Sequence, residues 1–225
     1  MPEPKPSVLQ LDFDGTVVHG DASWGILSHF VGDSMTERFA EASRLLKVDP
    51  GSTALVDVMK LGCSLLKAPL DECVAYAREM HPPRPGLGRL VTTALGLGLS
   101  VEINSYGFDF YIREYLRDAG VLSEVVLRCG RTTPHDGALA LSYTGPEGEN
   151  VTSLWKETWS EHYRRLGFRT VYVGDGRSDL PSAELAAAVC ARDELLASMP
   201  PSYPGVVRPF ETLNDVADGL ESLYR

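Results

Sequence analysis

Residues 8–16 read VLQLDFDGT, a short and mostly apolar run that ends in an acidic turn. An apolar run of this length, bounded by an Asp-Gly turn, is typical of a central strand in a parallel sheet. Two carboxylates, those of Asp12 and Asp14, stand at the end of this predicted strand. Open parallel sheets bind ligands beyond the carboxyl ends of their strands, so the segment predicts both an architecture and the place of a site.

Further apolar runs predict more strands of the same sheet. They cover residues 99–103, 125–128, 170–173 and 187–191. Segments with helical periodicity separate several of them, and strands that alternate with helices indicate a parallel α/β sheet. Residues 136–144 alternate around Gly137 and predict a small β-hairpin appended to the sheet.

Two helices between these strands are well marked. Residues 108–116 carry apolar side chains at i, i+3, i+4, i+7 and i+8, and Gly120 supplies a stop. Residues 153–166 carry Trp155 and Trp159 one helical turn apart. We expect the first of these helices to pack one face on the sheet.

Residues 18–85 show no good strand and contain four stretches with helical character. These stretches are residues 24–30, 36–47, 52–66 and 69–80. Structureless loops of this total length are uncommon, so the segment predicts a compact helical cap inserted after the first strand. The predicted domains are therefore an α/β core of residues 1–17 and 86–225 and a helical cap domain of residues 18–85.

Composition narrows the class of protein. The 225 residues include 31 acidic and 21 basic side chains, which gives a formal charge of -10 and argues against a nucleic acid partner. The four cysteines lack CxxC or zinc-site spacing, so we expect buried free thiols. No apolar run reaches the length of a membrane span. These features predict a cytoplasmic protein with no membrane partner.

Polar clusters follow three more of the predicted elements. Residues 104–107 read NSYG after the second strand, Lys156 lies near a helix start, and residues 174–179 read GDGRSD after the strand at 170–173. Because parallel strands end at one edge of a sheet, we expect these clusters to meet the acidic turn at residues 12–16.

The acidic residues of these clusters predict a cation. Asp12, Asp14 and Asp175 would bring three negative charges close together, which is unfavourable in a partly dry site unless they are neutralised. All-oxygen ligands favour Mg²⁺, which takes one or two carboxylates plus a substrate phosphate. A carboxylate in such a site can also attack phosphorus and form an aspartyl-phosphate.

The remaining polar residues suit a phosphoryl group. Ser105 and Lys156 supply a hydroxyl and a cation that can hold its oxygens. Gly15, Thr16 and Gly107 fit loops whose backbone N–H groups face an anion. Two structural alternatives stay open at this point, since Ser105 could cap the following helix and Lys156 could be a solvated side chain.

In these residues the sequence resembles the haloacid dehalogenase-like superfamily. Its phosphatases carry DxDGT, then a Ser or Thr after the second strand, then a Lys, then GDxxxD, and all four elements occur here in that order. The resemblance covers most of the chain and implies a Rossmann-like parallel sheet between helices, with the type 1 cap of phosphoserine phosphatase-like members. Residues 105–111 and 191–195 look most like the branch that contains the diketo-methylthiopentyl phosphate phosphatase of methionine salvage.

The resemblance also implies roles for the four aspartates. Asp12 would be the nucleophile, and Asp14 the general acid that protonates the leaving alkoxide and then the base that activates water. Asp175 would coordinate Mg²⁺ together with Asp12 and the backbone carbonyl of Asp14. Asp179 would be a further carboxylate in the outer shell of the metal.

By the same resemblance, Ser105 and Lys156 would hold the phosphoryl oxygens. Tyr106 departs from the pattern, because many relatives have Gly at that position, and it could reach toward the substrate. His19 and Asp21 are the candidates nearest the nucleophile for contacting the organic part of the substrate.

Together these features predict a Mg²⁺-dependent phosphomonoester hydrolase that acts on a small phosphorylated metabolite through an aspartyl-phosphate. Asp14 favours phosphoryl transfer over dehalogenation, which needs no acid at that position. A phosphotransferase or phosphomutase, and a catalytically silent relative that binds a phosphorylated ligand, remain alternatives. Arg84 and Arg113 could meet an anionic substrate, but we predict that they are surface side chains. A homodimer built on an exposed face of the cap or on the Trp155/Trp159 stripe is left open.

Overall fold

The structure is a computed structural model that describes residues 6–49 and 51–224. Its elements follow one another in this order: β1 (Ser7–Leu11), α1 (Ala22–Val31), α2 (Ser34–Val48), α3 (Ala54–Leu65), α4 (Leu70–Met80), α5 (Leu87–Gly96), β2 (Leu99–Phe108), α6 (Asp109–Asp118), β3 (Val125–His135), β4 (Ala138–Ser142), α7 (Trp155–Arg165), β5 (Arg169–Gly174), η1 (Arg177–Asp179), α8 (Leu180–Leu185), β6 (Ala188–Ala191), α9 (Asp193–Ser198), β7 (Val206–Pro209) and α10 (Leu213–Tyr224).

The described strands form one seven-stranded sheet in the order β4-β3-β2-β1-β5-β6-β7. β1 lies at its centre, parallel to both β2 and β5, and all five of its residues are buried. Only β4 runs antiparallel to its neighbour. The predicted α/β fold with a mostly parallel sheet is therefore confirmed. β7 was not predicted, because its four residues are an edge strand with little apolar patterning.

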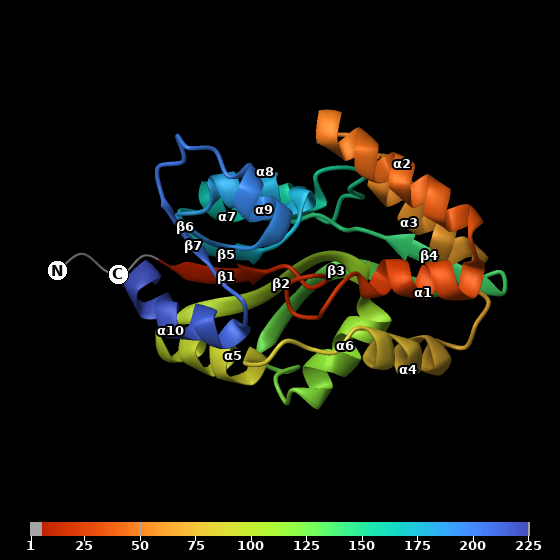
Figure 1. The fold of residues 1–225 in the computed structure, drawn as a ribbon, viewed down its shortest axis with the longest axis horizontal. Coiled ribbons are helices and arrows are strands. Elements are labelled where there is room, and N and C mark those ends of the chain that lie inside the picture. Colours follow the sequence, from red (N-terminus) through yellow and green to blue (C-terminus); the bar gives the residue numbers. More distant parts are fainter. Residues whose placement is uncertain (1–5, 50, 225) are drawn as a thin grey trace.

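Helices cover both faces of this sheet. Figure 1 shows α5, α6 and α10 on one side and α7, α8 and α9 on the other. The predicted helix at residues 108–116 is α6, which buries Tyr111, Ile112, Tyr115 and Leu116. Its apolar stripe therefore packs inward, as the spacing of these side chains predicts.

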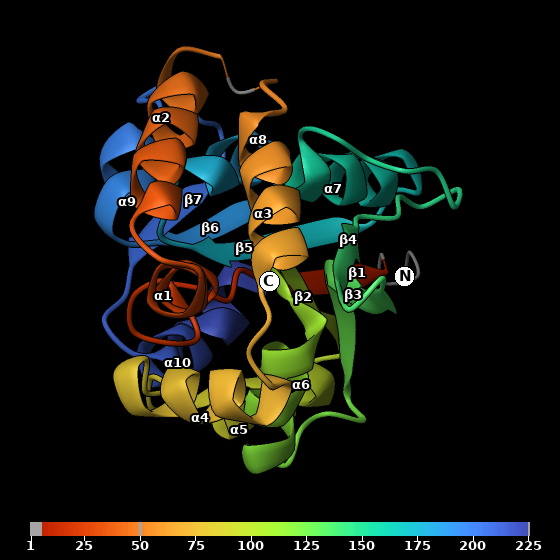
Figure 2. The same ribbon diagram turned by 90° about the vertical axis from the view of Figure 1, so that its right-hand side faces the viewer.

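The helices α1, α2, α3 and α4 form the predicted helical insertion after β1. Figure 2 looks onto the end of the molecule where α1, α2 and α3 lie in front of the sheet, with α4 below them beside α6. The chain segments that enter and leave the insertion pair with each other, because Val18 forms an antiparallel bridge with Pro83 and the N–H of Arg84 donates to the carbonyl of Val17 at 2.8 Å. This pairing of the two segments lies beside the predicted boundaries of the cap domain. The division into two domains stays a prediction.

Two local features differ from the predicted boundaries. β2 continues past Ile103 to Phe108, with an irregular register between Asn104 and Phe108, so Ser105 lies in a bulged strand end and does not cap α6. The hairpin turns at Asp136 and Gly137, and its first arm is the end of β3. That arm lies before the predicted range of residues 136–144.

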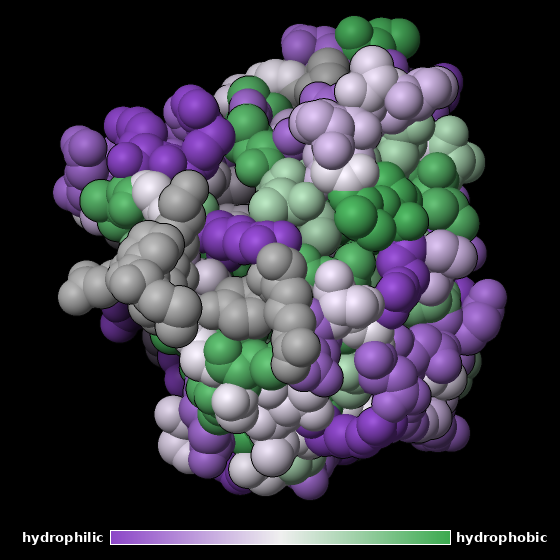
Figure 3. Space-filling view, turned by 90° about the vertical axis from the view of Figure 1, so that its left-hand side faces the viewer, coloured by the Kyte–Doolittle hydropathy of each residue, from purple (hydrophilic) through white to green (hydrophobic). Residues whose placement is uncertain are grey.

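The two tryptophans of α7 face the interior. Trp155 is 2% exposed and Trp159 is 6% exposed, so the stripe cannot serve as the surface of a homodimer. All four cysteines are free and buried, as predicted. None of the described helices is both long and apolar enough to cross a membrane. Figure 3 shows the face at the amino ends of the strands, where separate hydrophobic patches lie between hydrophilic residues.

A core substitution tests the central position of β2. Ile103 is fully buried between β1 and β3, so Ile103→Ala should lower the free energy of unfolding by about 2–5 kcal/mol through lost burial and an unfilled cavity. Val126 on β3 is 41% exposed, and Val126→Ala should change stability by no more than about 0.5 kcal/mol. Urea unfolding measures both, and equal losses would contradict the burial of β2.

Candidate active site

A cavity of about 310 Å³ opens at the carboxyl ends of β1, β2 and β5. Its lining consists of Asp12, Asp14, Gly15, Gly20, Asp21, Ser105, Tyr106, Gly107, Lys156, Asp175, Gly176 and Ser178. The structure thus brings residues from all four sequence clusters together around one polar space. We call it the strand-end cavity.

Asp12 lies at the floor of the strand-end cavity, directly after β1. Its backbone N–H donates to the carbonyl of Val173 on β5 at 2.9 Å, which anchors the residue between the two strands. Its side chain is buried, and one carboxylate oxygen accepts a 2.6 Å hydrogen bond from Lys156 Nζ. Burial, together with the negative charge of Asp179, raises the pKa of Asp12 well above its ordinary value, although Lys156 opposes this rise.

Lys156 lies on the first turn of α7 and is only 3% exposed. Its Nζ donates to Asp12 Oδ1 and to Asp179 Oδ1, each at 2.6 Å. Burial alone lowers the pKa of this lysine, but the two carboxylates outweigh that effect and raise it. The side chain is therefore a buried cation, and the alternative of a solvated surface lysine is wrong.

Asp179 is locked into the wall behind the cavity. It is fully buried and accepts hydrogen bonds from Tyr172 Oη at 2.7 Å and from the backbone N–H groups of Asp175 and Gly176 at 3.1 and 2.9 Å. Asp179 therefore shapes the loop after β5, and it does not line the cavity itself.

Asp175 does line the cavity, and Thr16 Oγ1 donates to it at 2.8 Å. Burial, and then the charge of Asp179, raises the pKa of Asp175 to about 6. The glycine before Thr16 is required by this packing, since Gly15 has φ 81° and a Cβ there would overlap the carboxylate of Asp175.

The acidic residues fit a divalent cation. Asp12, Asp175 and Asp179 each offer a carboxylate oxygen, and these atoms all lie within 4.8 Å of one another. One lysine cannot neutralise three clustered carboxylates, and hard oxygen donors suit a dication. The donor set thus agrees with the divalent metal site predicted at this end of the sheet.

The side chain of Asp14 takes a different set of partners from Asp12. It accepts hydrogen bonds from the N–H of Ala22 at 2.9 Å, from Ser23 Oγ at 3.3 Å and from Tyr111 Oη at 2.5 Å. Burial, and then the charge of Asp21, raises its pKa to about 7. Two carboxyl groups only two residues apart therefore have different partners and different environments.

Sequence reasoning missed Tyr111 as a partner of Asp14, because its place in the apolar stripe of α6 identified it only as a core residue. Gly107 is the signal that could have pointed to it. A Cβ at Gly107 would overlap Tyr111 Oη and come within 2.9 Å of Asp14 Oδ2, so a glycine is needed where the end of β2 passes this pair.

Ser105 and Tyr106 lie where the bulged end of β2 reaches the cavity. Ser105 is 1% exposed and its Oγ accepts the N–H of Gly107 at 2.9 Å. Tyr106 Oη accepts the N–H of Trp155 at 2.9 Å, and its carbonyl accepts Tyr143 Oη at 2.7 Å. Tyr106 is therefore fixed as part of the cavity wall.

Some predicted residues are placed differently. Thr16 and His19 do not line the strand-end cavity: Thr16 is buried against Asp175, and His19 is exposed beyond the turn. The N–H of Gly15 donates to the carbonyl of Gly20 at 2.6 Å, and that of Gly107 to Ser105, so neither N–H faces an anion here. The prediction that these two loops direct their backbone N–H groups at an anion is therefore wrong for Gly15 and Gly107, because the N–H groups bond within their own turns.

Arg84 is not the surface side chain that the sequence predicts. It is 8% exposed, and its Nε and Nη2 donate to the carbonyl of Gly15 at 3.3 and 3.2 Å. The buried guanidinium thus braces the acidic turn from the segment that leaves the helical insertion. Asp21 lines the cavity while its carboxylate caps α1 by accepting the N–H of Trp24 at 2.7 Å.

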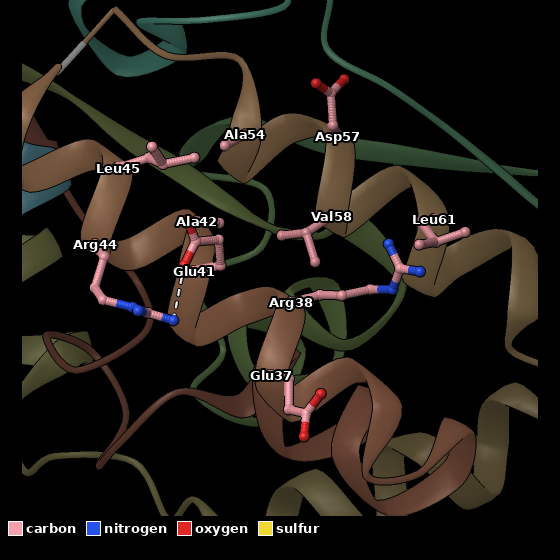
Figure 4. Close-up of a pocket in the computed structure, with 10 residues that line it drawn as sticks. All are labelled: Glu37, Arg38, Glu41, Ala42, Arg44, Leu45, Ala54, Asp57, Val58 and Leu61. Atoms are coloured by element: carbon pink, nitrogen blue, oxygen red, sulfur yellow. Dashed lines mark ion pairs between the residues drawn. The ribbon is translucent and has the colours of Figure 1, made fainter.

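Another cavity, of about 480 Å³, lies in the helical insertion between α2 and α3. Arg44 forms an ion pair with Glu41 at 2.7 Å beside this cavity. Figure 4 shows the ion pair, and it shows the side chain of Asp57 pointing away from these two residues. Arg44 and the apolar Val58 and Leu61 line this groove, but none of the predicted site residues does. It is therefore not part of the candidate active site.

Comparison with known proteins agrees with this geometry. A sequence profile described as haloacid dehalogenase-like hydrolase matches residues 10–184. The chain is 24% identical over 216 residues to the 2-hydroxy-3-keto-5-methylthiopentenyl-1-phosphate phosphatase of Bacillus thuringiensis subsp. konkukian (strain 97-27), covering 94% of each chain. It is 23% identical, with the same coverage, to the protein of that name from Bacillus cereus (strain G9842).

Solved structures share the fold. A phospho-aspartyl intermediate analogue of phosphoserine phosphatase superposes with a TM-score of 0.65 at 20% identity, covering 95% of this chain and 98% of the other. A substrate-bound phosphoserine phosphatase gives a TM-score of 0.64 at 19% identity, covering 96% and 99%. Phosphatase relatives thus extend over nearly the whole chain.

Metal binding tests the carboxylate cluster. Mg²⁺ at about 100-fold its Kd should add about 2.7 kcal/mol to the stability, which raises the Tm by roughly 5–10 °C for a chain of this size. Asp175→Asn should shrink this shift and raise the metal-free Tm, because it removes one of the crowded charges. Thermal melts in Mg²⁺ and in EDTA measure both effects.

The control for this experiment is Asp136→Asn. It removes the same charge from a side chain that is 93% exposed, at a turn with φ 48° that Asn tolerates. The control should keep the full Mg²⁺ shift. A wild-type Tm that does not respond to Mg²⁺ would exclude a metal at this cluster.

Proposed function

The chain belongs to the haloacid dehalogenase-like hydrolases, and from that premise we propose that it is a Mg²⁺-dependent phosphomonoester hydrolase that works through an aspartyl-phosphate. One observation carries the proposal: the Asp12 carboxylate lies at the floor of the strand-end cavity against the buried Lys156, with Asp14 in the same lining. A fixed carboxylate nucleophile with a second carboxyl group beside it is what transfer through an aspartyl-phosphate needs.

The chemistry takes two steps. An oxygen of Asp12 attacks the phosphorus of the substrate, the bond from phosphorus to the leaving oxygen breaks, and Asp14 gives its proton to the departing alkoxide. Asp14 then accepts a proton from a water molecule that attacks the acyl phosphate, which releases inorganic phosphate and restores Asp12. A pKa of about 7 supports this double role, since the group can give and take a proton near neutral pH.

Other side chains of the lining would bind and orient the phosphoryl group. Ser105, at the end of β2, and Lys156, in α7, line the same cavity. They supply a hydroxyl and an ammonium group for the phosphoryl oxygens. Asp12, Asp175 and the backbone carbonyl of Asp14 would hold Mg²⁺, with Asp179 behind them. The ion would supply positive charge beside the transferring group.

The leaving group would extend toward the helical insertion. A smaller cavity of about 230 Å³ shares Asp21, Gly176 and Ser178 with the strand-end cavity. Its wall in the insertion carries the apolar side chains of Phe39, Leu46, Leu55 and Met59. Such a wall supports a phosphate ester with an apolar portion, and the name of the Bacillus relatives, which contains a methylthiopentenyl group, points the same way.

Burst kinetics test the nucleophile and the acid-base residue separately. Asp12→Asn should reduce hydrolysis of p-nitrophenyl phosphate to background, because an amide cannot form the acyl phosphate. Asp14→Asn should still release about one equivalent of nitrophenolate, a leaving group that needs no proton, and then turn over about 10²–10⁴-fold more slowly. EDTA should silence the wild-type enzyme.

The alternatives predict different products. A phosphotransferase or mutase would release nitrophenolate without an equal amount of inorganic phosphate, and a silent relative would release neither. Near-normal turnover by Asp12→Asn, or activity that survives complete chelation, would refute the proposed mechanism.

Neighbouring leucines of α2 test the apolar wall. Leu46 lines the smaller cavity, whereas Leu45 lines the separate cavity between α2 and α3 that Figure 4 shows. Leu46→Asn should lower kcat/KM for an alkyl or thioalkyl phosphate by about tenfold, which corresponds to about 1.4 kcal/mol of lost apolar contact. The same variant should change kcat/KM for phosphoserine much less. Leu45→Asn is the matched control, and equal effects of the two variants would exclude the apolar wall from substrate binding.

A further inference from the structure

A third large cavity, of about 490 Å³, lies along β3, and none of the predicted site residues lines it. Its lining consists of Asp109, Arg113, Leu127, Arg128, Cys129, Arg131, Thr132, Thr133, Thr144, Trp155 and Trp159. We call it the β3-edge cavity, because β4 pairs only with residues 131–135 and, on the side of β3 away from β2, the described residues place no strand before that point. Figure 2 shows β3 between α6 and α7. Both helices contribute lining residues, Asp109 and Arg113 from α6 and the two tryptophans from α7.

The β3-edge cavity concentrates positive charge on a chain with a net charge of -10. Arg113, Arg128 and Arg131 come from two different elements and line the same space. Asp109 is the only acidic side chain in this lining, and its Oδ1 already accepts the N–H and the Oγ1 of Thr132, at 2.9 and 2.7 Å. The lining therefore carries more positive than negative charge.

Arg128 is held in a fixed orientation. Its Nε donates to the buried Glu102 at 3.3 Å, and its guanidinium lies over the ring of Trp159, 3.7 Å from the centroid. Tyr163 and Gln10 donate to the same Glu102 at 2.6 and 2.9 Å, so the carboxylate that holds the arginine is itself fixed. A guanidinium held at one edge and one face is preorganised to bind an oxyanion through its remaining N–H groups.

The guanidinium donors of the other two arginines have no acceptor among the described residues. Arg113 and Arg131 are exposed, and within residues 6–49 and 51–224 neither side chain makes an ion pair or a hydrogen bond. Exposed arginines alone would not define a site. Arg113 and Arg131 line the same cavity as the preorganised Arg128, so three positive side chains face one space.

Two buried tryptophans line the same cavity. Trp155 and Trp159 are 2% and 6% exposed and line the cavity, and the indole Nε1 of each has no hydrogen-bond partner among the described residues. Because both Nε1 atoms are enclosed, the two indoles belong to the cavity wall, and the guanidinium groups are the donors that a ligand in the cavity would meet.

From these observations we propose that the β3-edge cavity is a second ligand site, separate from the strand-end cavity, which binds a small metabolite through its phosphate or carboxylate oxygens. The volume suits a ligand of metabolite size. The recognition chemistry is the same for both kinds of oxyanion: forked guanidinium donors, with threonine hydroxyls in the same lining. This proposal does not depend on the proposed hydrolase activity.

The indole signals of the ¹⁵N-labelled full chain test this site. The three tryptophans are Trp24, Trp155 and Trp159, and Trp→Phe variants assign their signals. Inorganic phosphate and citrate are added in separate titrations, without divalent metal and at an ionic strength held constant with chloride. Either anion, or both, should shift the signals of Trp155 and Trp159 in a saturable way, and the anion that does so identifies the preferred oxyanion.

Paired variants separate this site from the strand-end cavity. Phosphate near Lys156 could also move the signal of Trp155, the preceding residue. Arg113→Ala with Arg131→Ala should weaken the binding seen at Trp155 and Trp159 by about tenfold or more, because two charge-assisted contacts are lost. Arg38→Ala with Arg165→Ala removes the same charge from exposed positions elsewhere and should leave the affinity unchanged.

Two results would overturn the proposal. One is the absence of a saturable shift of Trp155 and Trp159 with both anions at millimolar concentration. The other is equal affinity in the Arg113/Arg131 double variant and the wild type.

Discussion

The ammonium group of Lys156, held between Asp12 and Asp179, is the contact on which the candidate site depends. It joins α7 to the ends of β1 and β5, at 2.6 Å to each carboxylate. A single buried cation stabilises two carboxylates here, and Asp175 adds a third within reach of the same space. The remaining negative charge explains why a dication suits the cluster, and burial, followed by the charge of Asp179, raises the pKa of Asp12.

The second carboxyl group of the acidic turn is tied to the helical insertion instead. Asp14 accepts the N–H of Ala22 at the start of α1, and Tyr111 of α6 holds it from the core side. Arg84, from the segment that leaves the insertion, braces the carbonyl of Gly15. The position of the insertion and the position of Asp14 are therefore coupled through short hydrogen bonds, so a movement of α1 would be felt at the proposed acid-base residue.

The predictions that held rest on local patterns with one physical rule behind them. Apolar runs predict buried strands, and parallel strands end at the same edge of a sheet, so Asp12, Ser105, Lys156 and Asp175 were expected to meet. The predictions that failed concern the direction of side chains in irregular segments. The left-handed turn at Gly15 directs Thr16 toward Asp175 and leaves His19 outside the cavity, which residue type alone does not indicate.

The sequence by itself determined where along the chain the strands that carry the chemistry lie. It also determined which acidic, hydroxyl and basic groups stand at their ends, because hydrophobic periodicity and turn residues are local patterns. The tertiary structure alone decided which distant side chains complete them. Tyr111 meets Asp14 across 97 positions of the chain and Arg84 meets Gly15 across 69. The arginines of the β3-edge cavity likewise come together only when α6 and β3 pack, because such contacts depend on the packing angle of whole elements, which no local pattern encodes.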